Sequence, residues 1–223
     1  TGKPVVVLLV NGRPLAIPWL AEHMPAIIEG WQLGSQMGPA VADVLFGDAN
    51  PSGKLPVTFP RTTGQIPIYY NHKNSGRPPD STDFYTSKYL DVHWTPQFPF
   101  GWGLSYTTFS YAEPQLSAEK MAPDGSIQVA VRVSNTGSRS GAEVVQFYLQ
   151  DVVASVTRPV KQLRGFERVE LQPGESRTVT FTISPEDLAF YNQQMQRVVE
   201  PGEFRVFVGG NSVDVKSASF WVE

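Results

Sequence analysis

Cysteine is absent from this chain of 223 residues. Its absence excludes disulfide bonds, cysteine-ligated zinc and a thiol nucleophile. A strong positive charge is also lacking, because the net charge is −3, so nothing indicates binding to nucleic acid or to an anionic membrane. No apolar run reaches the ~18 residues that a membrane-spanning helix needs. The remaining composition, 41% hydrophobic and 17% charged residues, is typical of a globular protein.

Patterns for metal or nucleophilic chemistry are also scarce. The histidines His23, His72 and His93 have no histidine or carboxylate partner at helical spacing, which argues against a metal site. There is no glycine–x–serine–x–glycine turn for a nucleophilic serine and no phosphate-binding loop. We therefore expect neither a metal nor a cofactor. The chain starts at Thr1 without an initiator methionine, so we interpret it as a piece of a longer protein and infer nothing from the missing leader.

Residues 1–60 have the pattern of an α/β domain. Residues 5–10 form a continuous apolar run, which predicts a strand buried on both faces. Residues 26–28 predict a second short strand, and a helix should follow with Ser35 as its N-cap and Gly47 as its end. Two strands are too few for a doubly wound domain, so this part needs partner strands from elsewhere.

Residues 61–107 are rich in proline, glycine and aromatic residues and predict an irregular loop and linker. Residues 108–223 read as all-β, because apolar and polar side chains alternate along residues 127–133, 145–150, 178–183 and 204–208. Several short strands separated by turns over this length are the signature of an immunoglobulin-like sandwich. A sandwich of this size can bury its own core.

The irregular segment holds the best binding candidates. Aromatic rings can stack on sugar faces, and charged or imidazole groups can bond to sugar hydroxyls. The candidates for contact with a substrate are Tyr85, Lys88, Tyr89, Asp91, His93 and Trp94. For these residues, contact with a substrate and packing between two domains are equally supported. For Phe98, Phe100 and Trp102 we favour a packing role, as a wedge between two domains.

The spacing of the carboxylates in the sequence identifies no acid–base pair. The candidates are Glu22, Glu29, Asp43, Asp48, Asp80, Asp83 and Asp91. Glu29 follows an apolar strand directly, where α/β sheets place functional groups. For each we favour a cap, a turn or a solvated side chain. The turn at residues 34–38 precedes a helix and offers free N–H groups, yet we favour a plain tight connection there.

Several motifs together resemble glycoside hydrolase family 3. In the first part they are GKPVVV (2–7), NGRP (11–14), ADVLFGD (42–48) and NPSGKLP (50–56). Beyond it they are FPFGWGLSYT (98–107), VVQFYL (144–149) and RPVKQLRGF (158–166). The first set resembles the end of the family's α/β sandwich domain. The second resembles its hinge and its fibronectin-III-like domain. The resemblance is greatest to bacterial periplasmic β-glucosidases of the family.

That resemblance implies a retaining β-glucosidase as the parent enzyme. In the family, the nucleophilic aspartate lies on an N-terminal barrel, and the acid/base glutamate precedes the strand that opens this chain. No residue here matches either position, so we expect no catalytic residue in this chain and no activity from it alone. The family's glycine-rich, acidic turn is altered at residues 34–38, which leaves any pocket role of that turn unsupported.

Three functions therefore remain open. The chain is a silent C-terminal fragment of a β-glucosidase, or a carbohydrate-binding module, or a structural module that packs domains and forms a homodimer. In the first case its partners are the barrel and the first half of the α/β domain of the parent, whose substrates are β-glucosides or oligosaccharides. The resemblance implies a periplasmic or secreted location.

Overall fold

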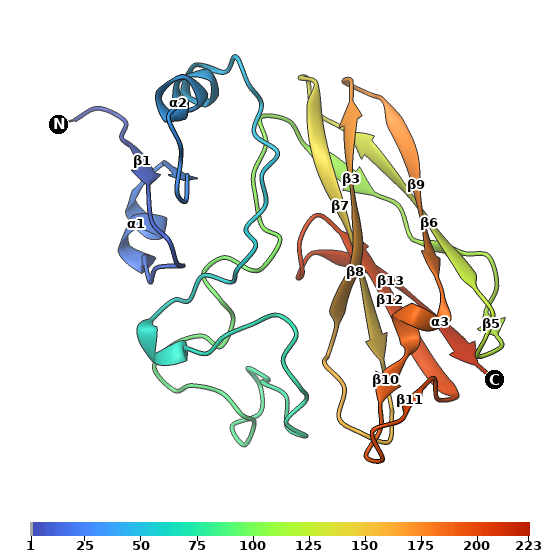
Figure 1. Cartoon of the computed structure of the whole chain (residues 1–223). Coiled ribbons are helices and arrows are strands. Elements are labelled where there is room, and N and C mark those ends of the chain that lie inside the picture. Colours follow the sequence, from blue (N-terminus) through green and yellow to red (C-terminus); the bar gives the residue numbers. More distant parts are fainter. Residues whose placement is uncertain (1) are drawn as a thin grey trace.

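The N-terminal part contains a small parallel sheet with two helices (Figure 1). In the computed structural model, which describes residues 2–223, strand β1 (Val6–Leu9) pairs with β2 (Ala26–Glu29). Helix α1 (Pro18–His23) connects them, because parallel neighbours need a crossover. Helix α2 (Met37–Phe46) follows β2. Both strands and the second helix were predicted from the sequence.

Two details of this part differ from the prediction. The prediction that residues 5–10 are buried on both faces is wrong, since Val6 is 46% exposed and Val10 is 52% exposed. Within residues 2–223 no element other than β2 packs extensively against β1, so its faces stay partly open to solvent. Ser35 as N-cap is also wrong, because α2 begins after Gln36 without a side-chain cap. Gly47 does end the helix, in the left-handed conformation at φ 84°.

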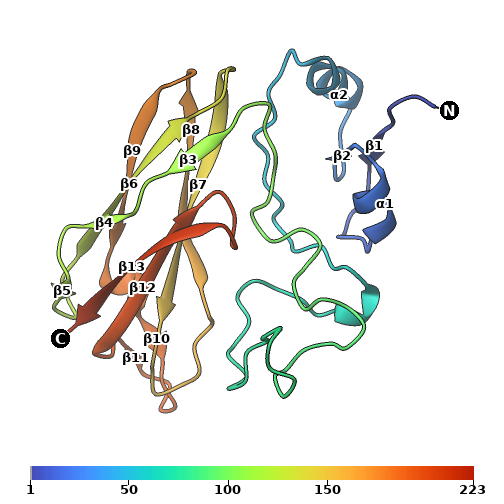
Figure 2. The same ribbon diagram turned by 180° about the vertical axis from the view of Figure 1, so that it is seen from behind.

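The linker, residues 47–108 between α2 and the first strand of the C-terminal part, is irregular and contains a single short helix η1 (Thr63–Gln65). Its two limbs run side by side between the N-terminal part and the sandwich (Figure 2). The Leu55 N–H donates to the Trp102 carbonyl at 2.8 Å, and the Gly101 N–H donates back to the Leu55 carbonyl at 2.8 Å. A bridge between Phe59 and Phe98 continues this pairing. The segment is therefore tied to itself by backbone hydrogen bonds although it forms no sheet.

The C-terminal part is a β-sandwich of two sheets, as the alternating segments predicted. One sheet joins β3 (Phe109–Tyr111), β4 (Gln115–Leu116), β6 (Ile127–Asn135) and β9 (Ser176–Ile183). The other, in spatial order, joins β5 (Lys120–Met121), β13 (Val215–Val222), β12 (Gly202–Gly209), β7 (Gly141–Asp151) and β8 (Gln162–Leu171). Helix α3 (Pro185–Leu188) and the pair β10 (Phe190–Tyr191) and β11 (Arg197–Val198) connect β9 to β12.

The sandwich core forms from the inward faces of the central strands. Val129, Val131 and Val133 of β6 face Phe147 of β7 and Val206 of β12 in one buried cluster. Fully burying each such side chain contributes about 1.5–3 kcal/mol, so the sandwich has a core of its own. Strand β7 departs from simple alternation. Its register against β8 shifts between Phe147 and Tyr148, as in a β-bulge.

Candidate functional site

The outward face of β7 is buried by the linker, which the sequence pattern did not predict. Gln146 is 3% exposed and Tyr148 is fully buried. The Gln146 Nε2 atom donates to the carbonyls of Gly101 at 3.1 Å and Gly210 at 2.6 Å. The Tyr148 hydroxyl donates to Gln146 Oε1 at 2.5 Å. These bonds satisfy the buried amide and fix the linker on the sandwich, because a buried amide left unpaired is costly.

A buried ion pair lies beside this contact. The Lys54 ammonium is 3.1 Å from the Glu143 carboxylate and also donates to the Gly103 carbonyl at 3.2 Å. The Tyr111 hydroxyl donates to the same carboxylate at 2.9 Å. Burial, followed by the charge of Glu143, raises the pKa of Tyr111 far above its usual range. The tyrosine therefore stays protonated and remains a donor, so the carboxylate is bonded from both sides.

Aromatic rings complete the interface. Phe100 stacks on Tyr70 with centroids 4.3 Å apart and meets the edge of Tyr148 at 6.5 Å. This geometry supports the predicted wedge role of Phe100. The rings of Phe98 and Phe59 meet in an edge contact with centroids 6.3 Å apart, and both residues belong to the linker. Such ring pairs each contribute about 0.5–1.5 kcal/mol beyond the area they bury.

An open cavity of about 690 Å³ lies in the loop of residues 76–86. It is lined by Gly76, Arg77, Pro78, Pro79, Asp80, Asp83, Tyr85 and Thr86. Hydrogen bonds from the Thr82 backbone and side chain lower the pKa of Asp80, which therefore carries a negative charge at neutral pH. The cavity thus offers a carboxylate, a guanidinium group and an aromatic ring to a polar ligand.

Two of the six predicted residues belong to this cavity region. Tyr85 lines it and is 77% exposed, and its ring meets the Phe84 ring in an edge contact with centroids 5.6 Å apart, so most of the Tyr85 ring still faces solvent. The Lys88 ammonium donates to the Asp80 carbonyl at 2.7 Å, to Thr86 Oγ1 at 3.0 Å and to the Asp83 carbonyl. Lys88 therefore holds the loop in shape through its own donors.

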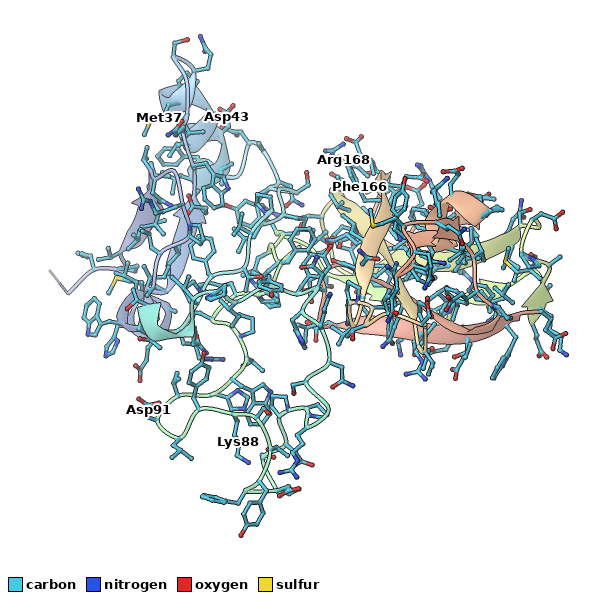
Figure 3. All side chains as sticks on the ribbon, turned by 60° about the horizontal axis from the view of Figure 1, so that its bottom comes forward. Met37, Asp43, Lys88, Asp91, Phe166 and Arg168 are labelled. Carbon is cyan, nitrogen blue, oxygen red and sulfur yellow. The ribbon has the colours of Figure 1, made fainter. Side chains whose placement is uncertain are left out.

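The other predicted residues lie further along the same loop. His93 stacks on Trp94 with ring centroids 4.2 Å apart, and its Nδ1 atom is 2.8 Å from Thr95 Oγ1. Gln65, buried beneath them, donates to the His93 carbonyl at 2.8 Å. Tyr89 and Asp91 are exposed between the two groups. Figure 3 shows Lys88 and Asp91 projecting from this loop, apart from Asp43 on α2 and Phe166 on β8.

Glu29 acts in local structure. One carboxylate oxygen accepts the Trp31 N–H at 2.9 Å, and the other accepts from Asn11 Nδ2 at 3.4 Å. Trp31 has φ 52°, which is uncommon for a residue other than glycine. The carboxylate thus stabilises a strained turn at the carboxyl end of β2. No cluster of metal-ligating side chains occurs among residues 2–223.

Sequence reasoning missed most of the cavity lining. Arg77 and Thr86 were not singled out, and Asp80 and Asp83 were considered only as carboxylates. The available signal was Pro78-Pro79 before an aspartate, a turn pattern in which the Asp80 side chain accepts the Thr82 N–H at 2.7 Å. That pattern predicts a turn, but it does not reveal that the turn closes around a hollow.

Comparison with known families defines the class of this fold. Residues 1–106 match the glycosyl hydrolase family 3 C-terminal domain, and residues 143–212 match the fibronectin type III-like domain. The chain therefore carries the C-terminal domain of glycosyl hydrolase family 3 followed by a fibronectin type III-like sandwich. This confirms the family and the fold class predicted from the sequence motifs.

Individual relatives make the assignment more specific. The chain is 55% identical over 222 residues to a periplasmic β-glucosidase of Salmonella typhimurium, covering 99% of this chain and 29% of that protein. It is 47% identical to a β-xylosidase of Formosa agariphila, of which it covers 30%. The crystal structure of a β-glucosidase from Listeria innocua in complex with glucose matches with a TM-score of 0.95 at 48% identity, over 99% of this chain and 31% of that one.

The chain thus spans less than a third of the length of these relatives and covers only their C-terminal part. In the described part of the chain, residues 2–223, no helix has the length and apolar character needed to cross a membrane.

Proposed function

We propose that this chain supplies the C-terminal part of a retaining β-glucosidase that removes β-linked glucose from glucosides, in the periplasm. The 55% identity to a periplasmic β-glucosidase over 222 residues carries this proposal. Retaining glycosidases need two carboxyl groups ~5–5.5 Å apart in a site that excludes water. The family resemblance implies that both groups lie in segments that this chain does not match, and we propose that the chain is inactive alone.

The exposed apolar surface of the N-terminal part supports this proposal. Trp19 on α1 is 59% exposed, Phe46 at the end of α2 is 83% exposed, and Val6 of β1 is 46% exposed. An exposed apolar surface of this kind on a two-stranded sheet is normally buried by further helices or strands. The preceding strands and the barrel of the parent enzyme are the partners we propose for it.

The loop of residues 76–94 is our proposed contribution to substrate binding. The exposed Tyr85 ring beside the 690 Å³ cavity supports it, together with the stacked His93 and Trp94. Tyr89, Lys88 and Asp91 lie on the same loop and complete the proposed set. Because relatives named as β-glucosidase and as β-xylosidase both match this chain, we place the choice of sugar in the segments beyond it.

The chain alone is expected to show no hydrolysis of an aryl β-glucoside. A chimera in which this chain replaces the matching 222 residues of the Salmonella β-glucosidase is expected to be active, within about tenfold of the parent kcat/KM. Release of the aryl group measures both. Hydrolysis by the isolated chain at enzyme-like rates, or a folded chimera without activity, would overturn the proposal.

In that chimera, Tyr85→Ala is expected to raise KM about fivefold with little change in kcat, because stacking of one ring contributes about 1 kcal/mol to ground state and transition state alike. Steady-state kinetics with a β-linked disaccharide measures the effect. Tyr191→Ala is the matched control, since Tyr191 is also an exposed tyrosine, 60% exposed, but lies on β10, outside the loop of residues 76–94. Equal KM values for the two variants would show that the loop does not contribute to substrate binding.

A further inference from the structure

A second, smaller hollow of about 230 Å³ lies at the end of β7, where the linker meets the sandwich. Its lining residues are Asn74, Gln150, Asp151, Val152, Val153, Ala154, Val156, Thr157, Arg158 and Val160. The Val160 N–H donates to the His72 carbonyl at 2.9 Å, and Lys73 forms a bridge with Pro159. These backbone contacts fix one wall of the hollow against the other.

The hollow contains an ion pair between a carboxylate and a guanidinium group that are too far apart for a direct hydrogen bond. Asp151 Oδ2 and Arg158 Nε are 3.8 Å apart, and the two side chains are only 6% and 17% exposed. Both atoms are buried and have no hydrogen-bond partner. At this separation the pair lacks a direct hydrogen bond, and burying such groups unsatisfied is unfavourable.

The unsatisfied atoms are held in place by their surroundings. The Arg158 guanidinium lies over the Phe190 ring, 4.6 Å from its centroid, and its terminal nitrogen donates to Gln162 Oε1 at 3.4 Å. Stacking on a ring restricts the guanidinium plane. The open donor and acceptor therefore have a fixed geometry, which is what a binding site for a small polar ligand requires.

The charges define the class of ligand. Asp151 repels anions and Arg158 repels cations, so the pair favours a neutral molecule. A hydroxyl group both donates and accepts, and its oxygen fits about 2.8 Å from each of two atoms that are 3.8 Å apart. The amides of Asn74 and Gln150 add further donors and acceptors, and the valines provide an apolar wall. The volume is below the ~300 Å³ of drug-sized sites, so it suits a single sugar ring.

We propose that this hollow binds one neutral monosaccharide unit, with a sugar hydroxyl bridging Asp151 Oδ2 and Arg158 Nε. The site lies on the sandwich, separate from the loop of residues 76–94, and does not depend on the proposed role of that loop. A buried water would bridge the same two atoms, and the experiment has to distinguish it from a sugar.

The pH dependence of sugar binding provides a second test of the proposal. Burial raises the pKa of Asp151 to about 6, with Glu200 acting in the same direction and Arg158 and the Val153 N–H opposing it. The remaining charged group nearby is Arg164, which acts on Arg158. The carboxylate is therefore ionised at neutral pH and accepts most strongly there. As the pH falls through about 6, protonation removes one acceptor and sugar binding weakens.

Titration of the 223-residue chain with D-glucose, followed by amide chemical shifts in ¹⁵N-HSQC spectra, tests the proposal. Saturable shifts are expected at residues 150–160 and at Asn74, with a Kd on the order of 1 mM. Asp151→Asn keeps the side-chain shape and is expected to weaken binding roughly tenfold or more. Glu186→Gln is the control, because it alters an exposed carboxylate paired with Arg197 and should leave the Kd unchanged.

Three results would overturn the proposal. The first is the absence of saturable shifts at residues 150–160, whether or not residues 76–94 respond. The second is an unchanged Kd in Asp151→Asn when its spectrum retains the native dispersion. The third is a glucose-soaked crystal in which an ordered water alone bridges Asp151 and Arg158. Shifts confined to residues 76–94 would still support the proposed role of the loop, so the two sites are tested independently.

Discussion

Gly101→Ala is expected to lower the free energy of unfolding by about 3 kcal/mol and to expose the linker to protease. Gly101 has φ 79°, a left-handed conformation in which a side chain adds about 1–2 kcal/mol of strain. A methyl group there would lie 2.0 Å from Gln146 Oε1 and 2.8 Å from Gln146 Cδ. The amide would have to leave its buried position, breaking the bonds that hold the linker. Urea denaturation and limited proteolysis measure the two effects.

Gly174→Ala separates the two causes of this loss. Gly174 has nearly the same φ, 77°, but a methyl group there would meet nothing within 4 Å. Only the backbone strain remains, so the expected loss is about 1 kcal/mol. Equal losses in the two variants would show that the fit of Gly101 against Gln146 contributes nothing.

Lys54→Met should destabilise the chain by about 3 kcal/mol, because it leaves the Glu143 carboxylate buried without its counter-charge. The side chains of Lys54 and Glu143 are 13% and 6% exposed in the native pair. The double variant Lys54→Met/Glu143→Gln removes both charges and is expected to recover part of the loss. The double-mutant cycle, measured by urea denaturation, gives the coupling energy of the pair.

The matched control is the exposed pair of Lys120 and Glu223, 2.6 Å apart, whose side chains are 64% and 58% exposed. Solvent screens this pair, so Lys120→Met should cost at most about 1 kcal/mol. A Lys54→Met variant no less stable than Lys120→Met would show that burial adds nothing to the ion pair. If the losses of stability in the two single variants simply add in the double variant, Lys54 and Glu143 are not coupled.

The sequence predicted those strands and helix ends that depend on residues close together in the chain. The alternation in residues 127–133 identified β6, since strand side chains alternate between core and solvent with a period of two residues. The apolar run near the N-terminus identified β1, and Gly47 identified the end of α2, because a left-handed residue there favours glycine. Motifs that combine several such positions were enough to identify the family.

Contacts between distant residues were outside the reach of those patterns. Gln146 looked like a solvent-facing residue in an alternating strand, but a linker carbonyl 45 positions away satisfies its amide. Lys54 and Glu143 are 89 positions apart, and neither carries a signal of pairing. The same holds for Asp151 and Arg158, whose facing arrangement depends on the turn between them and on Phe190. In the loop, the sequence indicated the aromatic residues but not the cavity beside them.

The register shift in β8 has a consequence for self-association. Phe147 pairs with Gly165 and Tyr148 pairs with Leu163, so Arg164 is left as an extra residue on the outermost strand of its sheet. Further along that strand, Arg168 forms an ion pair with Glu170 and donates to Ser52 of the linker at 3.2 Å. A bulged, charged outer strand discourages the addition of a strand from a second molecule. We therefore expect that a homodimer of this chain would not form by extending the sandwich sheet across β8.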